Sequence, residues 1–255
     1  IAQRALRCAI SDLAAMGAKP QAFHLALSLP KNTSQAWLES FSLGLRACAE
    51  EFNISLIGGD TTSSPALVVT LQVQGLVSAG KALTRDKAQV GDDIWLSGEI
   101  GRSAAALEGV LASPETFVEK DSGLASDYFY PQAQINLGQK LVGLAHSALD
   151  ISDGLLQDAS HIAKASNVCL NFSAAHIPTS ELAIALCGQA EALQLALTGG
   201  DDYQLLFTAP QQAHNELKDL NCYHVGQVEE RKAHSEWVLL DGQTVSHKSM
   251  GYQHF

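Results

Sequence analysis

Carboxylates stand beside glycines at three widely separated points of this sequence, each time after a short apolar run. The segments are Gly58-Gly59-Asp60, Asp150-Ile151-Ser152-Asp153-Gly154 and Gly199-Gly200-Asp201-Asp202. Glycine lets a backbone approach a ligand closely and leaves its N–H groups unobstructed. Carboxylates suit hard cations, since Mg²⁺ prefers oxygen ligands and is held by a few carboxylates together with substrate phosphates. The pattern therefore predicts a site where metal ions neutralise phosphate charge during phosphoryl transfer.

Each segment also has a plain structural explanation when it is taken alone. Glycine–aspartate pairs are common in turns, and Asp153 could cap the helix that follows it. Asp12 fits such an explanation less well, because it stands between Ile10 and Leu13 in an apolar stretch. A carboxylate near a core needs a partner or a metal ion. An ordinary aspartate on the surface of a helix is the alternative at that position.

Two further side chains are candidates for contact with phosphate. Arg85 comes soon after a predicted strand, where its guanidinium could form paired hydrogen bonds with phosphate oxygens, although a surface arginine in a hinge explains it equally well. Ser152, between two aspartates, could donate a hydrogen bond to a nucleotide or only to its own turn. The sequence contains no P-loop, no G-x-G-x-x-G loop and no protein-kinase motif, so a phosphate site must use another scaffold.

Helices and strands alternate along the chain that positions these side chains. The clearest helix is predicted over 34–52, with one apolar face made of Trp37, Phe41, Leu45, Cys48 and Phe52. A helix is also predicted over 1–16, and a loop over 114–131. Strands are predicted at 22–29, 53–57, 66–77, 94–96, 149–151, 168–172, 203–208, 222–228 and 236–240.

This alternation predicts an α/β or α+β fold class. The length of 255 residues agrees with one large domain or two modest ones, at about 150 residues a domain. A polar, glycine-bearing break at 81–92 places a boundary near residue 90, so the expected domains are 1–90 and 91–255. The chain opens at Ile1, without Met and directly in a helical pattern, so we expect it to be a piece of a longer protein.

Composition and charge exclude several classes of protein. Apolar residues make up 46% of the chain and charged residues 17%, which excludes a disordered or collagen-like chain. No apolar run is long enough to span a membrane. The net charge of −11 disfavours non-specific binding to nucleic acid or anionic lipid. The five widely spaced cysteines fit free thiols in a reducing cytosol, so a cytoplasmic location is expected.

Several segments together resemble a known family. In chain order they are Ser11-Asp12-Leu13-Ala14-Ala15-Met16-Gly17-Ala18, Ile57-Gly58-Gly59-Asp60-Thr61-Thr62, Asp150-Ile151-Ser152-Asp153-Gly154-Leu155, Gly199-Gly200-Asp201-Asp202-Tyr203 and Gly251-Tyr252-Gln253-His254-Phe255. From end to end the chain is similar to the thiamine-monophosphate kinases, in the superfamily of aminoimidazole ribonucleotide synthetase. The C-terminal motif is the most particular of these segments and favours the thiamine branch.

The resemblance implies ATP-dependent phosphorylation of thiamine monophosphate to thiamine diphosphate, with several Mg²⁺ ions. It also implies a homodimer, in which the N-terminal domains pair into a barrel-like sheet and each C-terminal domain is a mixed sheet flanked by helices. The Mg²⁺ ligands implied by the matching motifs are Asp12, Asp60, Asp150 and Asp153. The implied ATP contacts are Gly59, Asp60, Arg85 and Ser152, and the implied contacts of thiamine monophosphate are Asp201 and Tyr252. Catalysis is expected to rest on Asp12, Asp60, Asp153 and Arg85.

The chain departs from the family pattern in two respects. The N-terminal segment of the family, with further metal-binding aspartates, is expected to be missing here, and such a piece alone would hold an incomplete set of metal ligands. The family usually reads Gly-Gly-Glu-Asp-Tyr-Glu where this chain has Asp201 in place of the first glutamate, one methylene shorter. Two alternatives therefore stay open: another ATP-using enzyme of the superfamily, such as a selenophosphate synthetase or an amidine-forming ligase, and a non-catalytic nucleotide-binding remnant.

Overall fold

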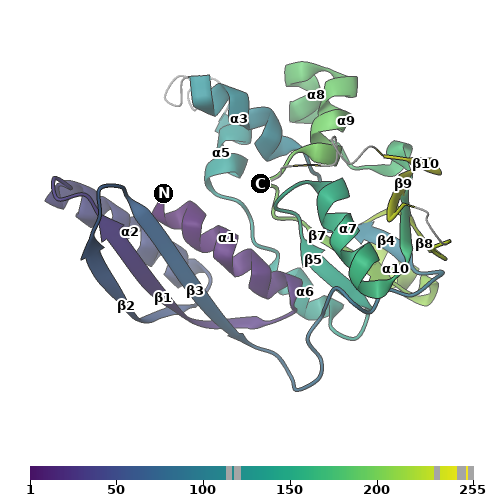
Figure 1. Ribbon diagram of the computed structural model, residues 1–255, viewed down its shortest axis with the longest axis horizontal. Helices are drawn as coiled ribbons and strands as arrows, with labels where there is room; N and C mark the ends of the chain where they lie inside the picture. The colour runs from purple at the N-terminus through teal and green to yellow at the C-terminus, as the bar shows by residue number, and fades with distance from the viewer. Residues whose placement is uncertain (113–116, 118–121, 233–235, 246–250, 252–255) are drawn as a thin grey trace.

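The computed structural model of the chain describes residues 1–112, 117, 122–232, 236–245 and 251. The strands form two separate sheets, and helix α1 (Ala2–Ala15) runs between them (Figure 1). Helices pack against both sheets, so the predicted α/β (α+β) class is confirmed. No helix in the described ranges combines the length and the apolar character that crossing a membrane requires.

The first sheet has three strands in the order β2-β1-β3. Strand β1 (Lys19–Leu29) lies between its parallel neighbour β2 (Ser55–Ser63) and its antiparallel neighbour β3 (Val68–Leu76). Helices α1 and α2 (Gln35–Glu51) pack on one face of this sheet. The core between them contains Leu6, Ile10, Phe23, Leu27, Phe41, Leu45 and Cys48. Side chains of β3 alternate between half-buried and exposed, whereas every residue of the edge strand β2 is exposed.

The second sheet has seven strands in the order β10-β9-β6-β8-β4-β7-β5. They are β4 (Asp93–Leu96), β5 (Ser147–Asp150), β6 (Cys169–Phe172), β7 (Leu205–Ala209), β8 (Tyr223–Glu229), β9 (Val238–Leu240) and β10 (Gln243–Thr244). The pair β6–β9 is parallel and the other described pairs are antiparallel. The sheet is therefore mixed, as the family resemblance implies.

The second sheet lies on the right of Figure 1, and the remaining helices surround it. They are α3 (Arg102–Ala112), α5 (Ser122–Phe129), α6 (Ile135–Leu141), α7 (Leu155–Ser166), α8 (Glu181–Cys187), α9 (Gln189–Thr198) and α10 (His214–Asp219), with short 3₁₀ turns at Ala174–His176 and Gln211–Ala213. Helix α7 presents Leu155, Leu156, Ala159 and Ile162 to the largest apolar core of the molecule. This face follows the spacing of an amphipathic helix, so its burial holds the start of α7 in place.

Helix α1 ties the two sheets together. Its first half packs on the three-stranded sheet, while Ala14 and Ala15 in its last turn join an apolar cluster around Trp95 of β4. Helix α6 approaches this turn so closely that a Cβ at Gly138 would lie 2.1 Å from the carbonyl oxygen of Ala14. Asp12 stands between these two halves of α1 and is therefore held in a defined position relative to both sheets.

The strand predicted over 53–57 begins at Ser55 and continues to Ser63, which corrects its predicted end before Gly58. Strand β2 continues through Gly59 and Asp60, which pair in parallel register with Leu25 and Ala26 of β1. The close pairing explains the glycine, because a Cβ at Gly59 would lie 1.9 Å from the carbonyl oxygen of Leu25. Asp60 thus belongs to a strand and not to the end of one.

Another prediction also needs correction. Part of the predicted loop over 114–131 is helix α5, because Leu124 is buried against Ala106 and Val110 of α3. Trp37 lies on the apolar face predicted for its helix, where it is half-buried, packs against the core of the first sheet and stacks on Phe41 with ring centroids 5.1 Å apart. Its helix itself is confirmed within one residue at each end.

Candidate active site

Three of the predicted site residues line one cavity of about 400 Å³. Asp12 comes from α1, Arg85 from the connection that follows β3, and Asp150 from the end of β5. The rest of the lining consists of Ala15, Met16, Leu83, Thr84, Asp86, Ala148 and Leu149. We call this space the Asp12 cavity. It gathers carboxylates and a guanidinium from distant parts of the chain, a combination that suits a polyphosphate accompanied by a cation.

Two carboxylates of the Asp12 cavity, Asp12 and Asp150, lie in surroundings that oppose their ionisation. Burial raises the pKa of Asp150, against smaller effects of the Ser11 hydroxyl and Arg85. Although Asp12 is exposed on its outer side, desolvation and then the charge of Asp150 raise its pKa, while Arg85 lowers it. A cation placed between two such carboxylates relieves both effects, because it favours their charged forms.

The donor set of this cavity fits Mg²⁺. Within the described ranges, no group of three or more histidine, cysteine, aspartate or glutamate side chains is arranged to hold a metal ion by itself. Mg²⁺ needs fewer protein ligands than that, since it keeps several waters and completes its coordination with substrate phosphates. Asp12 and Asp150 supply hard oxygen ligands of this kind, so the residues fit the metal that the resemblance implies.

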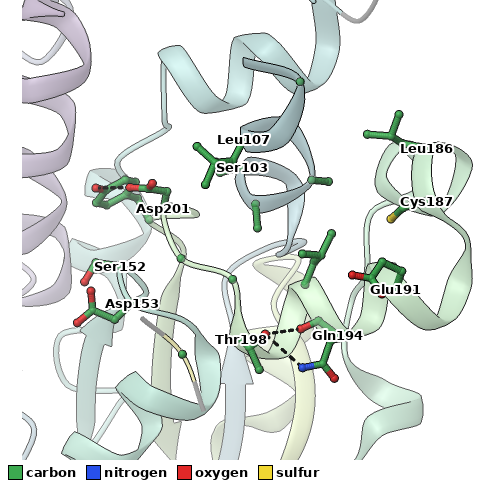
Figure 2. A pocket seen from close by; sticks show the side chains of 18 of the residues that line it. Ser103, Leu107, Ser152, Asp153, Leu186, Cys187, Glu191, Gln194, Thr198 and Asp201 are labelled. Carbon is green, nitrogen blue, oxygen red and sulfur yellow. Dashed lines mark hydrogen bonds between the residues drawn. The ribbon is translucent and has the colours of Figure 1, made fainter. Parts of the chain in front are cut away.

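A larger cavity, of about 1200 Å³, begins two residues beyond Asp150. Ser152, Asp153 and Asp201 lie on one side of it, and Glu191 and Gln194 of α9 lie on the other (Figure 2). The remaining lining comes mainly from α3, from the end of α8 and from the glycines before Asp201. We call this space the Asp201 cavity. Its size accommodates a small organic molecule, and its lining combines apolar surface with a few polar groups, as in many ligand sites.

Asp158, which the sequence analysis did not single out, holds the turn between the two cavities. Its carboxylate oxygen Oδ2 accepts hydrogen bonds from the backbone N–H groups of Ser152 at 2.9 Å and Asp153 at 3.0 Å. Burial raises the pKa of Asp158 to about 7. Helix α7 has Gly154 and not Asp153 at its N-cap position, which removes the capping explanation of Asp153. A carboxylate on the apolar face of a predicted helix was the signal that could have identified Asp158.

The turn that carries Asp201 lies directly against the same segment. The N–H of Asp201 donates to the carbonyl oxygen of Ser152 at 2.9 Å, and the N–H of Tyr203 donates to that of Ile151 at 2.8 Å. Gly200 permits this approach, because a Cβ there would lie 2.2 Å from the carbonyl oxygen of Ser152. The segments 150–154 and 199–202, which are far apart in the sequence, therefore form one continuous wall of the Asp201 cavity.

Asp202 has a different role from Asp201. It is buried, and its carboxylate accepts hydrogen bonds from the backbone N–H groups of Gly101 at 2.7 Å and Ser103 at 3.3 Å. These N–H groups open helix α3, where donors otherwise lack partners. Burial, the largest effect, raises the pKa of Asp202 to about 7 against the lowering effect of these hydrogen bonds. Asp202 thus anchors the helix that forms one wall of the Asp201 cavity.

The carboxylate of Asp201 is itself held by two donors. Nη2 of Arg4, on α1, lies 2.8 Å from Oδ1, and the hydroxyl of Tyr203 donates to the same oxygen at 3.0 Å. The sequence analysis missed Arg4, since the ion pair joins residues that are far apart in the sequence and has no local signature.

The other predicted site residues are not brought to these cavities by the single chain. Gly59 and Asp60 line neither cavity and lie on the exposed edge strand β2. Oδ1 of Asp60 accepts a hydrogen bond of 2.8 Å from the N–H of Thr61. Tyr252 lies outside the described residues, but Gly251, directly before it, lines the Asp201 cavity.

Both parts of the chain match one class of proteins. Residues 1–77 match the AIR synthase related protein, N-terminal domain, and residues 89–238 match the corresponding C-terminal domain. The fold is therefore the two-domain architecture of AIR synthase related proteins.

Relatives with a more specific function cover the whole chain. A thiamine-monophosphate kinase of Haemophilus influenzae is 38% identical over 263 residues, which span 100% of this chain and 80% of the relative. The crystal structure of the thiamine-monophosphate kinase from Stenotrophomonas maltophilia K279a has a TM-score of 0.87 and 38% identity, covering 96% of this chain and 79% of that one. A structure of AaThiL complexed with AMPPCP and TMP has a TM-score of 0.87 and 29% identity, covering 100% and 82%. The chain belongs to the thiamine-monophosphate kinase family and is a kinase.

Proposed function

We propose that this protein transfers the γ-phosphoryl group of ATP to thiamine monophosphate, giving thiamine diphosphate and ADP. The observation that carries the proposal is the adjacency of the two cavities, whose linings meet in the segment from Asp150 to Asp153. One cavity offers charged groups suited to a polyphosphate, and the other has room for an organic acceptor. In support, a 29% identical relative has been solved as a complex with AMPPCP, an analogue of ATP, and TMP.

On the nucleotide side, we assign phosphate contacts to Arg85 and Ser152, together with Gly59 and Asp60 of β2. The guanidinium of Arg85 is exposed and lines the Asp12 cavity, where it is available to phosphate oxygens. The exposed Ser152 is placed at the entrance of the neighbouring cavity, where its hydroxyl could donate to the transferred group.

Mg²⁺ would be held by Asp12, Asp150 and Asp153, with Asp60 as a further ligand. When bound, it would neutralise charge on the phosphate groups and orient them. The position of Asp12 and Asp150 in the lining of one cavity supports this assignment. Burial raises the pKa of both carboxylates, and a bound cation would favour their charged forms.

On the acceptor side, Asp201 and Tyr252 are assigned to thiamine monophosphate in the Asp201 cavity. An oxygen of its phosphate group attacks the γ-phosphorus of ATP, and the bond from that phosphorus to the bridging oxygen of ADP breaks. The attacking oxygen is already ionised, so no side chain is required as a strong base. Catalysis then consists of positioning and charge neutralisation, to which Arg85 contributes directly.

We also propose that the protein is a homodimer that pairs through the first sheet. Strand β2 has one edge without a partner strand among the described residues, and its Leu56 and Ile57 are 52% and 56% exposed. Exposed apolar side chains along a free strand edge are typical of a surface that another chain covers. Such pairing would account for Asp60, which reaches neither cavity of its own chain. We propose 1–90 as the nucleotide- and metal-binding, dimerising domain and 91–255 as the second domain.

The decisive experiment follows ADP release by the protein as its gene encodes it, with ATP and Mg²⁺, and with or without thiamine monophosphate. Thiamine diphosphate is identified by chromatography. ADP release that requires thiamine monophosphate supports the proposal. Thiamine, which lacks the phosphate, serves as the control acceptor and should give no product. Binding of ATP without any turnover would overturn the proposal in favour of a non-catalytic nucleotide-binding protein.

A further inference from the structure

Arg4 connects three elements through one guanidinium. It stands in the first turns of α1, and its side chain is 20% exposed. Nη1 donates to the carbonyl oxygen of Tyr128 on α5, and the guanidinium carbon lies 4.0 Å from the centre of the Tyr128 ring. Nη2 pairs with Asp201 at 2.8 Å. A planar guanidinium that stacks on a ring and donates in two directions has little rotational freedom left.

The turn that Arg4 reaches has an unusual backbone. Asp201 has φ +70° and Tyr203 has φ +53°, so two residues with side chains adopt the left-handed region on either side of Asp202. This conformation costs free energy for a residue other than glycine and persists only where the surroundings enforce it. Here it brings the hydroxyl of Tyr203 within 3.0 Å of the Asp201 carboxylate. Burial raises the pKa of Tyr203, so the hydroxyl keeps its proton and donates.

Both donors meet the same oxygen of Asp201. Arg4 and Tyr203 engage Oδ1, and the hydrogen bonds and ion pairs found among the described residues leave Oδ2 without a protein donor. Asp201 is also part of the lining of the larger cavity. A carboxylate that is held through one oxygen has a fixed orientation, and its second oxygen is available to contact a ligand.

We propose that Arg4 is a positioning residue for the acceptor, which acts by fixing where Oδ2 of Asp201 is presented in the Asp201 cavity. The proposal rests on the proposed function. The reach of the pair depends on the lengths of both side chains, because the long arginine approaches from α1 and meets the short stem of an aspartate.

This length argument gives a specific test. Lysine places its terminal nitrogen one bond closer to its backbone than arginine does, and glutamate places its carboxylate one bond further out than aspartate. Arg4→Lys alone therefore leaves a gap, and Asp201→Glu alone crowds the pair. The double variant Arg4→Lys/Asp201→Glu restores the combined reach. A purely structural role for Arg4 does not predict such mutual rescue.

The experiment measures KM for thiamine monophosphate, KM for ATP and kcat for the wild type, Arg4→Met, Arg4→Lys, Asp201→Glu and the double variant. Arg4→Met should raise KM for thiamine monophosphate about tenfold, with KM for ATP changed less than about twofold. The double variant should have a lower KM for thiamine monophosphate than either of its single variants. Arg46→Met is the matched control, since Arg46 forms an exposed ion pair with Glu50 on α2, away from both cavities.

Three results would overturn the proposal: an unchanged KM for thiamine monophosphate in Arg4→Met, equal increases in both KM values, or a double variant no better than the single ones. If Arg4→Met does not fold, the comparison of Arg4→Lys with the double variant decides alone. A wild type that gives no thiamine diphosphate overturns the proposed function itself, and this outcome is separate from any difference between variants.

Discussion

The N–H of Asp153 donates a hydrogen bond of 3.0 Å to the buried carboxylate of Asp158. The same oxygen accepts the N–H of Ser152 at 2.9 Å, so one carboxylate sets the backbone of a turn whose side chains line the Asp201 cavity. Asp158 does not line either cavity itself. Its contribution to the site is therefore the shape of the turn.

Asp158→Ala should lower kcat/KM by roughly a hundredfold and should destabilise the fold by about 1–3 kcal/mol, because two part-buried backbone N–H groups lose their acceptor. Asp158→Asn is the informative companion. Both hydrogen bonds end on one oxygen, which an amide also offers, so this variant should keep most of the activity. Steady-state kinetics and urea unfolding measure the two effects. Equal damage from both substitutions would show that the charge of Asp158 matters and not its acceptor geometry.

Asp12→Asn should abolish turnover while leaving the fold intact. The raised pKa of Asp12 comes from desolvation and from Asp150, so a neutral side chain relieves repulsion in the protein without metal. Thermal unfolding with and without Mg²⁺ and ATP separates the two consequences. The melting temperature without ligand should stay level or rise, and the increase caused by Mg²⁺ with ATP should shrink.

Asp153→Asn provides the companion measurement for the same site. Because Gly154 occupies the N-cap of α7, this substitution should not weaken the helix, and turnover should fall without loss of stability. Full activity in Asp153→Asn would remove Asp153 from the proposed metal ligands.

Stability should depend on pH through Asp202. Its pKa is raised to about 7 in the folded protein, whereas an aspartate in the unfolded chain titrates near its ordinary value. Between these two values the folded protein keeps a proton that the unfolded chain has released, so the free energy of unfolding falls as the pH rises and levels off above pH 7. From pH 5 to pH 8 the loss due to this group is on the order of 2 kcal/mol.

Urea unfolding of Asp202→Asn at pH 5 and at pH 8 tests whether Asp202 causes this loss of stability. The variant carries no titrating group at this position, so its stability should fall less between pH 5 and pH 8 than that of the wild type. Asp158, with its pKa also raised to about 7, contributes in the same direction and should leave part of the dependence in place. An identical pH dependence in wild type and variant would contradict the assignment to Asp202.

The proposed pairing of two chains through β2 predicts that Ile57→Asp yields a monomer. A charge on the exposed apolar edge would have to be buried against the partner, which is costly. Light scattering coupled to size-exclusion chromatography measures the mass. Val90→Asp is the matched control, because Val90 is exposed to a similar degree, 59% against 56% for Ile57, but lies outside the first sheet. A wild type that is monomeric at micromolar concentration would contradict the pairing.

Periodicity and turn residues allowed much of the fold to be predicted. The helix over 34–52 was recognisable because its apolar residues repeat on one face, and α2 covers nearly the same range. Strand β2 was underestimated, since glycines usually interrupt strands and only the close pairing with β1 explains Gly59 inside one. Helix α5 was missed, because its stability comes from contacts with α3 and not from a local apolar stripe.

By itself, the sequence determined which residue types are available and which short segments carry them: the glycine–aspartate motifs, the arginine that follows the strand predicted over 66–77, and the family to which they point. Only the tertiary structure decided which of them meet. It placed Asp12, Arg85 and Asp150 around one cavity, left Asp60 on an exposed strand, and brought Arg4 to Asp201. The physical reason is the separation in sequence over which each kind of interaction acts. Helical and strand patterns arise from neighbours within a turn or two, whereas a shared cavity or an ion pair between residues far apart in the sequence depends on how whole elements pack.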